Sequence, residues 1–436
     1  MSDLAFFLTE GGDEVTVISS RMRYDLPDAV LENRERYRGV EICRVFTTRF
    51  GRSWLPGRAL DYLSFYLSAT RALLCQARRG DVVVVKTDSP MLSVLIAPIA
   101  LLRGCKMINW LQDLYPEVAG ELGMAVAKGA IGRALARLRD GSLRTAGLNV
   151  VIGDDMAQRL RARGITPEKI AIMPNWADDE SIRPIESAEN ALRAEWGLQG
   201  KFVVVYSGNL GRAHDVETLL GAAVRLKEHS DICFLFIGGG HGITQLREQV
   251  DALDLPNVFF RPYQPRENLS QSLCVGDVHW LSLKPGLDGL LLPSKFYGIA
   301  AAGRPVIVIG SLDGELSRLV ENEHCGVAIA PGESQVLAAT LSDLADNRAH
   351  CEAMGRRIRR LLDQRFSRAR ALERWATLLH LVAAGARYGV PRDASPRGTP
   401  RRFTSSGGAA PSPPTLAGYH IFGHFLPEGA FLYHSV

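Results

Sequence analysis

Cysteine is scarce in this sequence, and the spacing that would give it a structural role is missing. The seven cysteines lie far apart, and no two of them have Cys-x-x-Cys spacing. We therefore expect neither disulfides nor a zinc site, and the pattern favours a reducing, cytoplasmic environment. The start of the chain does not have the pattern of a signal peptide, so we expect none.

The chain also lacks a strong excess of one charge and a long apolar run. It has 51 Lys and Arg residues against 47 Asp and Glu residues, a formal charge of +4, which argues against a dedicated nucleic-acid-binding protein. The most apolar stretch, MLSVLIAPIALL at 91–102, is shorter than the roughly 20 residues that span a bilayer and contains Pro98. We predict a buried helix there, with a helix that touches lipid as the alternative.

Short apolar segments alternate with helical patterns along most of the 436 residues. This alternation indicates parallel sheets covered by helices on both faces. One series of strands is followed by a polar segment at 173–198 and then by a second series. The strands are expected at 13–20, 80–87, 105–113 and 146–153, then at 201–208, 232–240, 257–263, 277–283 and 304–310. We predict an α/β protein with two Rossmann-like, doubly wound domains in series, joined by 173–198.

Both ends of the chain depart from this pattern. Residues 2–12, SDLAFFLTEGG, have the pattern of the helix that normally follows a first strand and its glycine-rich turn. We therefore predict that the first domain lacks its first strand. From about 387 the chain is rich in Pro, Gly, Ser and Arg without an apolar period, so we predict that residues 387–436 are a disordered tail.

Two junctions in the second half could bind an anion. In VVYSGNLGRAHDVETLL, residues 204–220, glycines and Arg212 stand between a strand and the expected start of a helix. In LPSKFYG, residues 292–298, Ser294 can cap a helix that begins at Lys295. Helix starts expose unpaired amides and a partial positive charge, which suit a phosphate. The alternatives are a tight turn and a solvated lysine. A further cluster, IGGGHG at 237–242, lacks the spacing of a dinucleotide site.

Four segments in order resemble the retaining family 4 glycosyltransferases of the GT-B fold, in particular those of bacterial exopolysaccharide, O-antigen and colanic-acid synthesis. The segments are NWLQDLYPE at 109–117, MPNWAD at 173–178, YSGNLGRAHDVETLL at 206–220 and LPSKFYGIAAAGRPVI at 292–307. The resemblance covers about residues 1–380. It implies two domains that face a cleft, with the acceptor bound by residues 1–180 and a nucleotide-diphospho-sugar by residues 181–386.

The resemblance also implies roles for individual residues. Arg212 and Lys295 would neutralise the departing diphosphate, the step that needs electrostatic help. Asp113 would activate the acceptor hydroxyl or orient the sugar, with helix capping as its alternative role, and Glu117 is a second candidate on the acceptor side. The residues implied to contact the donor are Gly208, Asn209, Leu210, Gly211, Tyr263, Gln264, Ser294, Tyr297 and Gly298. A UDP-sugar is favoured, and neither a metal nor a cofactor is expected.

Two departures from the family pattern concern the donor site. Gly298 stands where the family usually has a glutamate that binds the donor ribose, and Asp288 is the nearest acid to the position of the first glutamate of that motif. The usual lysine after Arg212 is absent, with His214 and Asp215 near its place. We infer that Lys295 takes over that charge. The ribose assignment becomes weaker, whereas the class is less affected.

A membrane surface and a lipid-linked acceptor are expected partners. Residues 127–147 form a basic, amphipathic pattern in which Ile131, Leu135 and Leu138 recur at helical spacing, so this helix could lie on anionic lipid. The alternative is a solvated cationic face over the core. The expected acceptor is a saccharide or a lipid-linked molecule. A polyprenyl-diphosphate-linked saccharide, which the resemblance suggests, would suit a peripheral enzyme on the inner face of the plasma membrane. Two other functions stay open: a sugar-nucleotide 2-epimerase, and a truncated remnant that only binds nucleotide.

Overall fold

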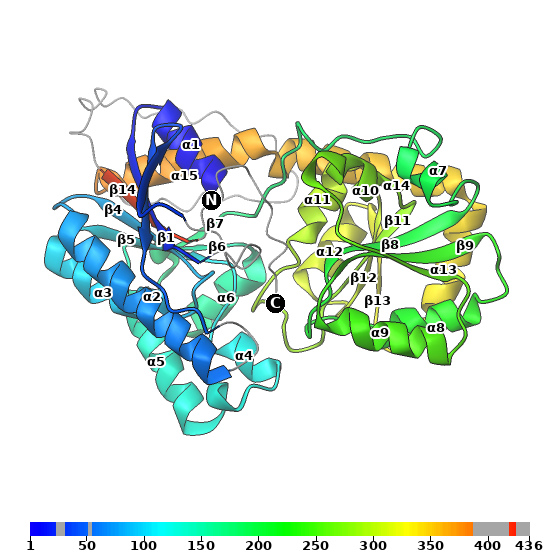
Figure 1. Cartoon of the computed structure of the whole chain (residues 1–436), viewed down its shortest axis with the longest axis horizontal. Helices are drawn as coiled ribbons and strands as arrows, with labels where there is room; N and C mark the ends of the chain where they lie inside the picture. Colours follow the sequence, from blue (N-terminus) through cyan, green and yellow to red (C-terminus); the bar gives the residue numbers. More distant parts are fainter. Residues whose placement is uncertain (23–30, 51–54, 387–417, 424–436) are drawn as a thin grey trace.

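Two α/β domains lie side by side in this computed structural model, which describes all residues except 23–30, 51–54, 387–417 and 424–436 (Figure 1). The first sheet has the strand order β2-β3-β1-β14-β4-β5-β6-β7, and the second has β10-β9-β8-β11-β12-β13. All pairings are parallel except that of β2 with β3. The predicted class, two doubly wound domains, is confirmed.

The strands of the first sheet are, in chain order, β1 (Glu14–Ser20), β2 (Arg34–Tyr37), β3 (Val40–Val45), β4 (Val82–Lys86), β5 (Lys106–Leu111), β6 (Leu148–Val151), β7 (Ile170–Ile172) and β14 (Gly418–Phe422). Helices α2 (Leu55–Gln76) and α3 (Leu92–Arg103) pack on one face, and α1 (Ser2–Glu10) packs on the other. Three more helices, α4 (Glu117–Glu121), α5 (Gly129–Thr145) and α6 (Asp154–Ala162), complete the domain. The central strands are apolar on both sides because helices cover both faces.

The second sheet contains β8 (Phe202–Asn209), β9 (Ile232–Gly239), β10 (Val258–Arg261), β11 (Val278–Ser282), β12 (Val306–Ile309) and β13 (Gly326–Ile329). One face carries α8 (Glu217–Arg225), α9 (His241–Ala252) and α13 (Ser334–Asp346). The other carries α7 (Ala191–Glu195), α10 (Leu269–Cys274), α11 (Lys295–Ala301) and α12 (Glu315–Asn322), while α14 (Arg348–Leu361) contributes to the cores of both faces.

The tail supplies a central strand of the first sheet. β14 lies between β1 and β4, parallel to both, and the residue pairs Ile18–Phe422 and Val85–Phe422 fix its register. Tyr419 and Ile421 are buried in the core on one face and Phe422 in the core on the other. The prediction of a disordered tail is therefore wrong for residues 418–422, and the place of the expected missing strand is filled. The remaining tail residues lie outside the described part of the chain.

The last helix also returns to the first domain. α15 (Arg368–Ala383) packs beside α1 on the first sheet, where the rings of Trp375 and Trp110 lie 4.4 Å apart (Figure 1). The predicted second domain, residues 181–386, includes this helix, but the structure places its apolar face in the core of the first domain. The two connections between the domains run together, because Ala177 forms a parallel bridge with Ser367.

Candidate active site

A cleft opens between the domains at the carboxyl ends of the strands of the second sheet. Its volume is about 690 Å³. One wall is the end of α4 and the residues after it, including Leu122 and Gly123, and the rest comes from the second domain. Second-domain residues in the lining include Gly211, Arg212, His214, Gly242, Gln245, Lys284 and Leu287. In open α/β sheets, ligands bind at this edge, outside the carboxyl ends of the strands.

Lys295 is a buried cation without a counter-charge. It is the first residue of α11 and only 9% exposed. Among the described residues, no hydrogen bond or ion pair reaches its ammonium group, which lies 5.3 Å from the centre of the Tyr206 ring. Burial lowers the pKa of Lys295 to about 8. A charge held in this way needs a compensating anion, so the surroundings of Lys295 suit a negatively charged ligand.

His214 holds the loop after β8 and carries no charge. Its Nε2 atom lies 3.0 Å from the Tyr206 hydroxyl, and its Nδ1 atom lies 3.0 Å from the carbonyl oxygen of Ser282. Because a carbonyl oxygen only accepts, Nδ1 carries the proton. Burial and the nearby charge of Lys295 lower the pKa of His214 to about 3. His214 is therefore neutral at pH 7 and does not replace the lysine that the family pattern has near this position.

The glycine junction differs from its prediction in one respect. We expected a helix to begin near Asn209, but α8 begins only at Glu217, and Leu210 between them is fully buried. The start of α9 lies closer, since the amide of Gly242 donates to the carbonyl of Leu210 at 3.1 Å. The helix whose amides lie near the junction is therefore α9. A helix that began directly after β8 would expose the side chains of Leu210 and His214, which are both buried.

Close packing explains two of the glycines. Gly208 and Gly238 have φ values of 136° and 128°, in the region that favours glycine. A Cβ atom at Gly238 would lie 2.3 Å from the carbonyl oxygen of Gly208. The ends of β8 and β9 thus approach each other more closely than side chains would allow, and this role is independent of any ligand.

The other predicted donor residues are spread over different environments. Tyr263 is half exposed, with its ring against Gly239 at the end of β9. Gln264 donates to the carbonyl of Pro262 at 3.1 Å. Ser294 is exposed at the N-cap of α11. Tyr297 is buried in the core, 5.4 Å from the Phe366 ring, so the structure does not bring it to the cleft.

Two cations line the cleft, whereas Lys295 lies behind the lining residue His214, whose pKa it lowers. Arg212 is exposed in the lining, as is Lys284 two residues after β11. Lys284 was not among the residues predicted from the sequence, although it follows a predicted strand in a glycine-containing loop. The amide of Lys284 donates to the carbonyl of Ala213 at 2.9 Å, which joins the loops that follow β8 and β11.

On the first domain, Asp113 faces the second domain. It follows β5, and its backbone forms a bridge with Leu291, four residues before Lys295. Burial and the nearby carboxylate of Asp88 raise the pKa of Asp113 to about 7, against the opposing effect of Lys86. Lys86 and Asp88 form an ion pair at 2.7 Å. This pair, formed by the last residue of β4 and a residue just after it, was not among the candidates from the sequence.

Glu117 has partners inside its own domain. Its carboxylate accepts two hydrogen bonds from Arg139, the shorter at 2.7 Å, and also pairs with Arg163. These contacts join α4 to α5 and α6. A carboxylate engaged in this way holds helices together, and it has less capacity left for an acceptor substrate.

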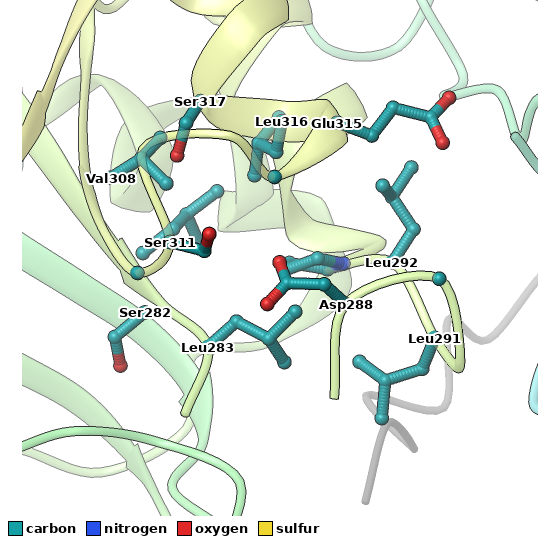
Figure 2. A pocket seen from close by; sticks show the side chains of 15 residues that line it. Ser282, Leu283, Asp288, Leu291, Leu292, Val308, Ser311, Glu315, Leu316 and Ser317 are labelled. Atoms are coloured by element: carbon teal, nitrogen blue, oxygen red, sulfur yellow. The ribbon is translucent and has the colours of Figure 1, made fainter. Parts of the chain in front are cut away.

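A second, much smaller pocket lies beside Asp288 (Figure 2). Its volume of about 20 Å³ leaves space for little more than one water molecule. The carboxylate of Asp288 points into it from the loop after β11, while that of Glu315 points away (Figure 2). Burial raises the pKa of Asp288. Gly298 lines neither of the two pockets. Of these two pockets, the larger cleft alone has room for a ligand of nucleotide size.

The two halves of the chain match two glycosyltransferase families. Residues 2–176 match the family described as "Glycosyl transferase 4-like domain", and residues 189–361 match "Glycosyl transferases group 1". The probable glycosyltransferase WbjE of Pseudomonas aeruginosa is 28% identical over 324 residues, which cover 73% of this chain and 79% of WbjE. The putative colanic acid biosynthesis glycosyl transferase WcaI of Escherichia coli is 28% identical over 290 residues, 65% of this chain and 70% of WcaI.

Solved structures show the same arrangement of domains. Sucrose-phosphate synthase of Thermosynechococcus elongatus superposes with a TM-score of 0.69 at 16% identity, covering 88% of this chain and 92% of that protein. Anabaena HepE in complex with UDP superposes with a TM-score of 0.63 at 15% identity, covering 84% of this chain and 99% of HepE. The structural matches show the GT-B fold, and the family matches with the curated relatives show that the chain is a glycosyltransferase, whose first half is similar to the glycosyl transferase 4-like domain and whose second half is similar to the group 1 family.

Proposed function

We propose that the enzyme transfers a sugar from a UDP-sugar to a saccharide or lipid-linked acceptor, with retention, in the synthesis of a bacterial cell-surface polysaccharide. The second domain binds the donor, and the first binds the acceptor. The names of WbjE and WcaI support a role in glycan synthesis, and the HepE complex with UDP supports the choice of nucleotide. As a retaining enzyme it would belong to glycosyltransferase family 4.

The unpaired ammonium of Lys295 is the observation that carries this proposal. A buried lysine with a lowered pKa costs the folded protein stability, and such a cost is typical of groups that meet an opposite charge during function. The diphosphate that leaves the sugar supplies that charge. Arg212 and Lys284 line the cleft, where they would add positive charge around the same group.

Asp113 would act on the acceptor side. With a pKa of about 7, its carboxyl group is partly ionised at neutral pH and can take a proton from an acceptor hydroxyl. The bridge with Leu291 places it next to the segment that leads to Lys295. The proton acceptor and the cation for the leaving group would thus come from opposite domains, which requires the cleft to be closed during transfer.

A 2-epimerase is not supported by the described residues of the cleft. Such an enzyme needs histidines and acids that can exchange protons with the sugar, whereas both ring nitrogens of His214 have protein partners and the ring is neutral. A remnant that only binds nucleotide differs from an active enzyme in the assay below.

We place the enzyme on the inner face of the plasma membrane, because Ile131 and Leu138 of α5 are exposed and not in the core.

The test is a transfer assay with the purified chain. UDP- and GDP-sugars are offered with polyprenyl-diphosphate-linked saccharides, nucleotide release is measured, and the anomeric configuration of the product is determined by NMR. We expect UDP release that depends on the acceptor, an α-linked product from an α-linked donor, and a loss of at least about tenfold in Lys295→Ala. Lys227→Ala, which changes a surface lysine of the same domain, is the control. Nucleotide binding without any transfer would support the remnant.

A further inference from the structure

One side of α2 exposes a row of leucines. Leu60, Leu63, Leu67 and Leu74 are 44%, 50%, 60% and 40% exposed, although α2 also has an opposite side that is buried in the core. Their spacing of three, four and seven residues keeps them on one side of the helix. Single exposed leucines are common, but four in a row on one helix form a patch that needs an explanation.

Two neighbouring helices also carry exposed apolar side chains. α3 lies between α2 and α5 and contacts both, and all three helices form one layer of the first domain (Figure 1). Leu101 and Leu102 on α3 are 64% and 74% exposed. Ile131 and Leu138 on α5 are also exposed. We call this surface the leucine face, defined by Leu60, Leu63, Leu67, Leu74, Leu101, Leu102, Ile131 and Leu138.

The exposed charges on these three helices have one sign. Their acidic residues, Asp61 on α2 and Asp140 on α5, are both buried. In the described parts of α2, α3 and α5, no acidic side chain is exposed. The exposed cations on these helices and at the start of α5 are Arg58, Arg71, Arg103, Lys128, Arg133, Arg137 and Arg144. A surface that is both apolar and purely cationic is complementary to an anionic lipid surface.

We propose that the leucine face docks the first domain on an anionic membrane, with leucines in the interfacial layer and arginines against lipid phosphates. A second copy of this chain fits the same surface poorly. A symmetric dimer would place cations against cations across the interface, and such contacts between like charges are unfavourable. The lipid surface satisfies both the apolar and the charged side chains.

This docking would explain how a lipid-linked acceptor reaches the cleft, a point that rests on the proposed function. The wall of the cleft formed by Leu122 and Gly123 is followed, after only a few residues, by α5. Met124 in this connection is also exposed. The cleft and the leucine face are therefore adjacent along the chain, and an acceptor held in the membrane would meet the cleft at its edge.

Vesicle binding tests the proposal. The full chain is sedimented with phosphatidylglycerol-containing vesicles and with phosphatidylcholine vesicles, at low and high salt. We expect binding to the anionic vesicles only, weakened by salt. We test two sets of substitutions. The leucine set combines Leu63→Glu, Leu67→Glu and Leu101→Glu, and the arginine set combines Arg71→Gln, Arg133→Gln and Arg137→Gln. Each set should reduce the constant for vesicle binding at least about tenfold. The control, Leu253→Glu with Val336→Glu, changes exposed residues of the second domain and should leave binding unchanged.

Other outcomes would overturn the docking proposal. These are the absence of binding to anionic vesicles, or equal binding of all variants, with circular dichroism confirming that each variant is folded. A concentration-dependent dimer in light scattering that only the leucine variant loses would assign the face to a second copy instead. UDP affinity, measured by calorimetry, should be unchanged in both sets. Lost vesicle binding with normal UDP affinity thus separates a failure of docking from a failure of the proposed function.

Discussion

Lys295 shows how a single side chain can lower stability for the sake of binding. Its neighbours are the Tyr206 ring and the neutral His214, and neither compensates a positive charge fully. The sequence indicated only a lysine at a helix start. The structure shows that this lysine is buried and that its charge therefore lowers the stability of the fold. An exposed lysine at the same place would stay hydrated and would have no such cost.

We predict that Lys295→Met makes the enzyme more stable but unable to bind UDP tightly. Methionine fills similar space without a charge, so the free energy of unfolding should rise by about 1–3 kcal/mol. The gain should be largest below pH 8, where the lysine is charged in the folded protein, and should shrink as pH rises towards 10.5. Thermal unfolding and UDP calorimetry measure the two effects. Lys284→Met is the control for stability, and a destabilised Lys295→Met would contradict the argument.

Asp113 should set the pH dependence of transfer. If it accepts the proton, kcat/KM rises as pH increases through about 7, where the carboxyl group loses its proton. Asp113→Asn should remove this rise and lower kcat/KM by about 100-fold or more. It should also stabilise the fold above pH 7, where the buried carboxylate is charged, and have little effect near pH 4. Unchanged activity in Asp113→Asn would contradict its role as proton acceptor, and unchanged activity with lower stability would assign Asp113 a structural role.

Among the secondary-structure elements, β14 is the one with the largest consequence. It lies between β1 and β4, which are not consecutive strands of the chain, and it pairs with both. His420 and Asp81 lie 2.9 Å apart at its side, and the amide of Gly418 also donates to Asp81. Without β14, β1 and β4 would each lose a parallel partner in the middle of the core.

We therefore predict that Ile421→Asp disrupts the first domain. Ile421 is fully buried, so an aspartate there would cost about 3 kcal/mol or more, or prevent pairing of the strand. Hydrogen exchange should become faster in β1 and β4, while the second sheet stays protected. Ile421→Val, which removes a single methylene group, should cost only about 1 kcal/mol. Unchanged exchange in β1 and β4 would show that β14 does not hold them.

At the scale of the whole molecule, polar contacts and a shared apolar cluster hold the two domains together. The Glu315 carboxylate accepts from the amides of Asp154 and Asp155 at the start of α6, at 2.9 and 3.0 Å. Arg318 pairs with Asp155 at 2.7 Å. Leu114 and Leu291 belong to one apolar cluster that spans both domains. A helix start favours a carboxylate, so Glu315 acts as a latch between the domains.

Gly153→Ala should open this latch. A Cβ atom at Gly153 would lie too close to the carboxylate of Glu315, so this end of the side chain must move away and lose its hydrogen bonds to the amides of Asp154 and Asp155. We expect a larger radius of gyration in X-ray scattering and a weaker UDP-dependent closure, with a cost of about 1–2 kcal/mol for the lost contacts. Gly141→Ala in α5, where a Cβ atom meets nothing within 4 Å, is the matched control. Equal scattering of both variants would contradict the latch.

The sequence determined the local features of this protein. The apolar period predicted β1, β4, β5, β6 and β8 to β12 and the doubly wound class, but it did not predict β2, β3, β7 or β13. The four family segments indicated a glycosyltransferase. These features depend on residues that are close in the chain, such as VVVVK in β4. The boundary of α8 was predicted too early, because burial of Leu210 and His214 is decided by distant partners such as Ser282.

Tertiary structure decided the remaining features. GYHIF in the tail becomes a strand because a gap between β1 and β4 offers partners for its backbone, and no local pattern reveals such a gap. α15 joins the first sheet for the same kind of reason. The unpaired state of Lys295 and the leucine face likewise depend on which atoms surround a side chain. Composition and spacing cannot determine these surroundings, because they arise only when segments far apart in the chain pack together.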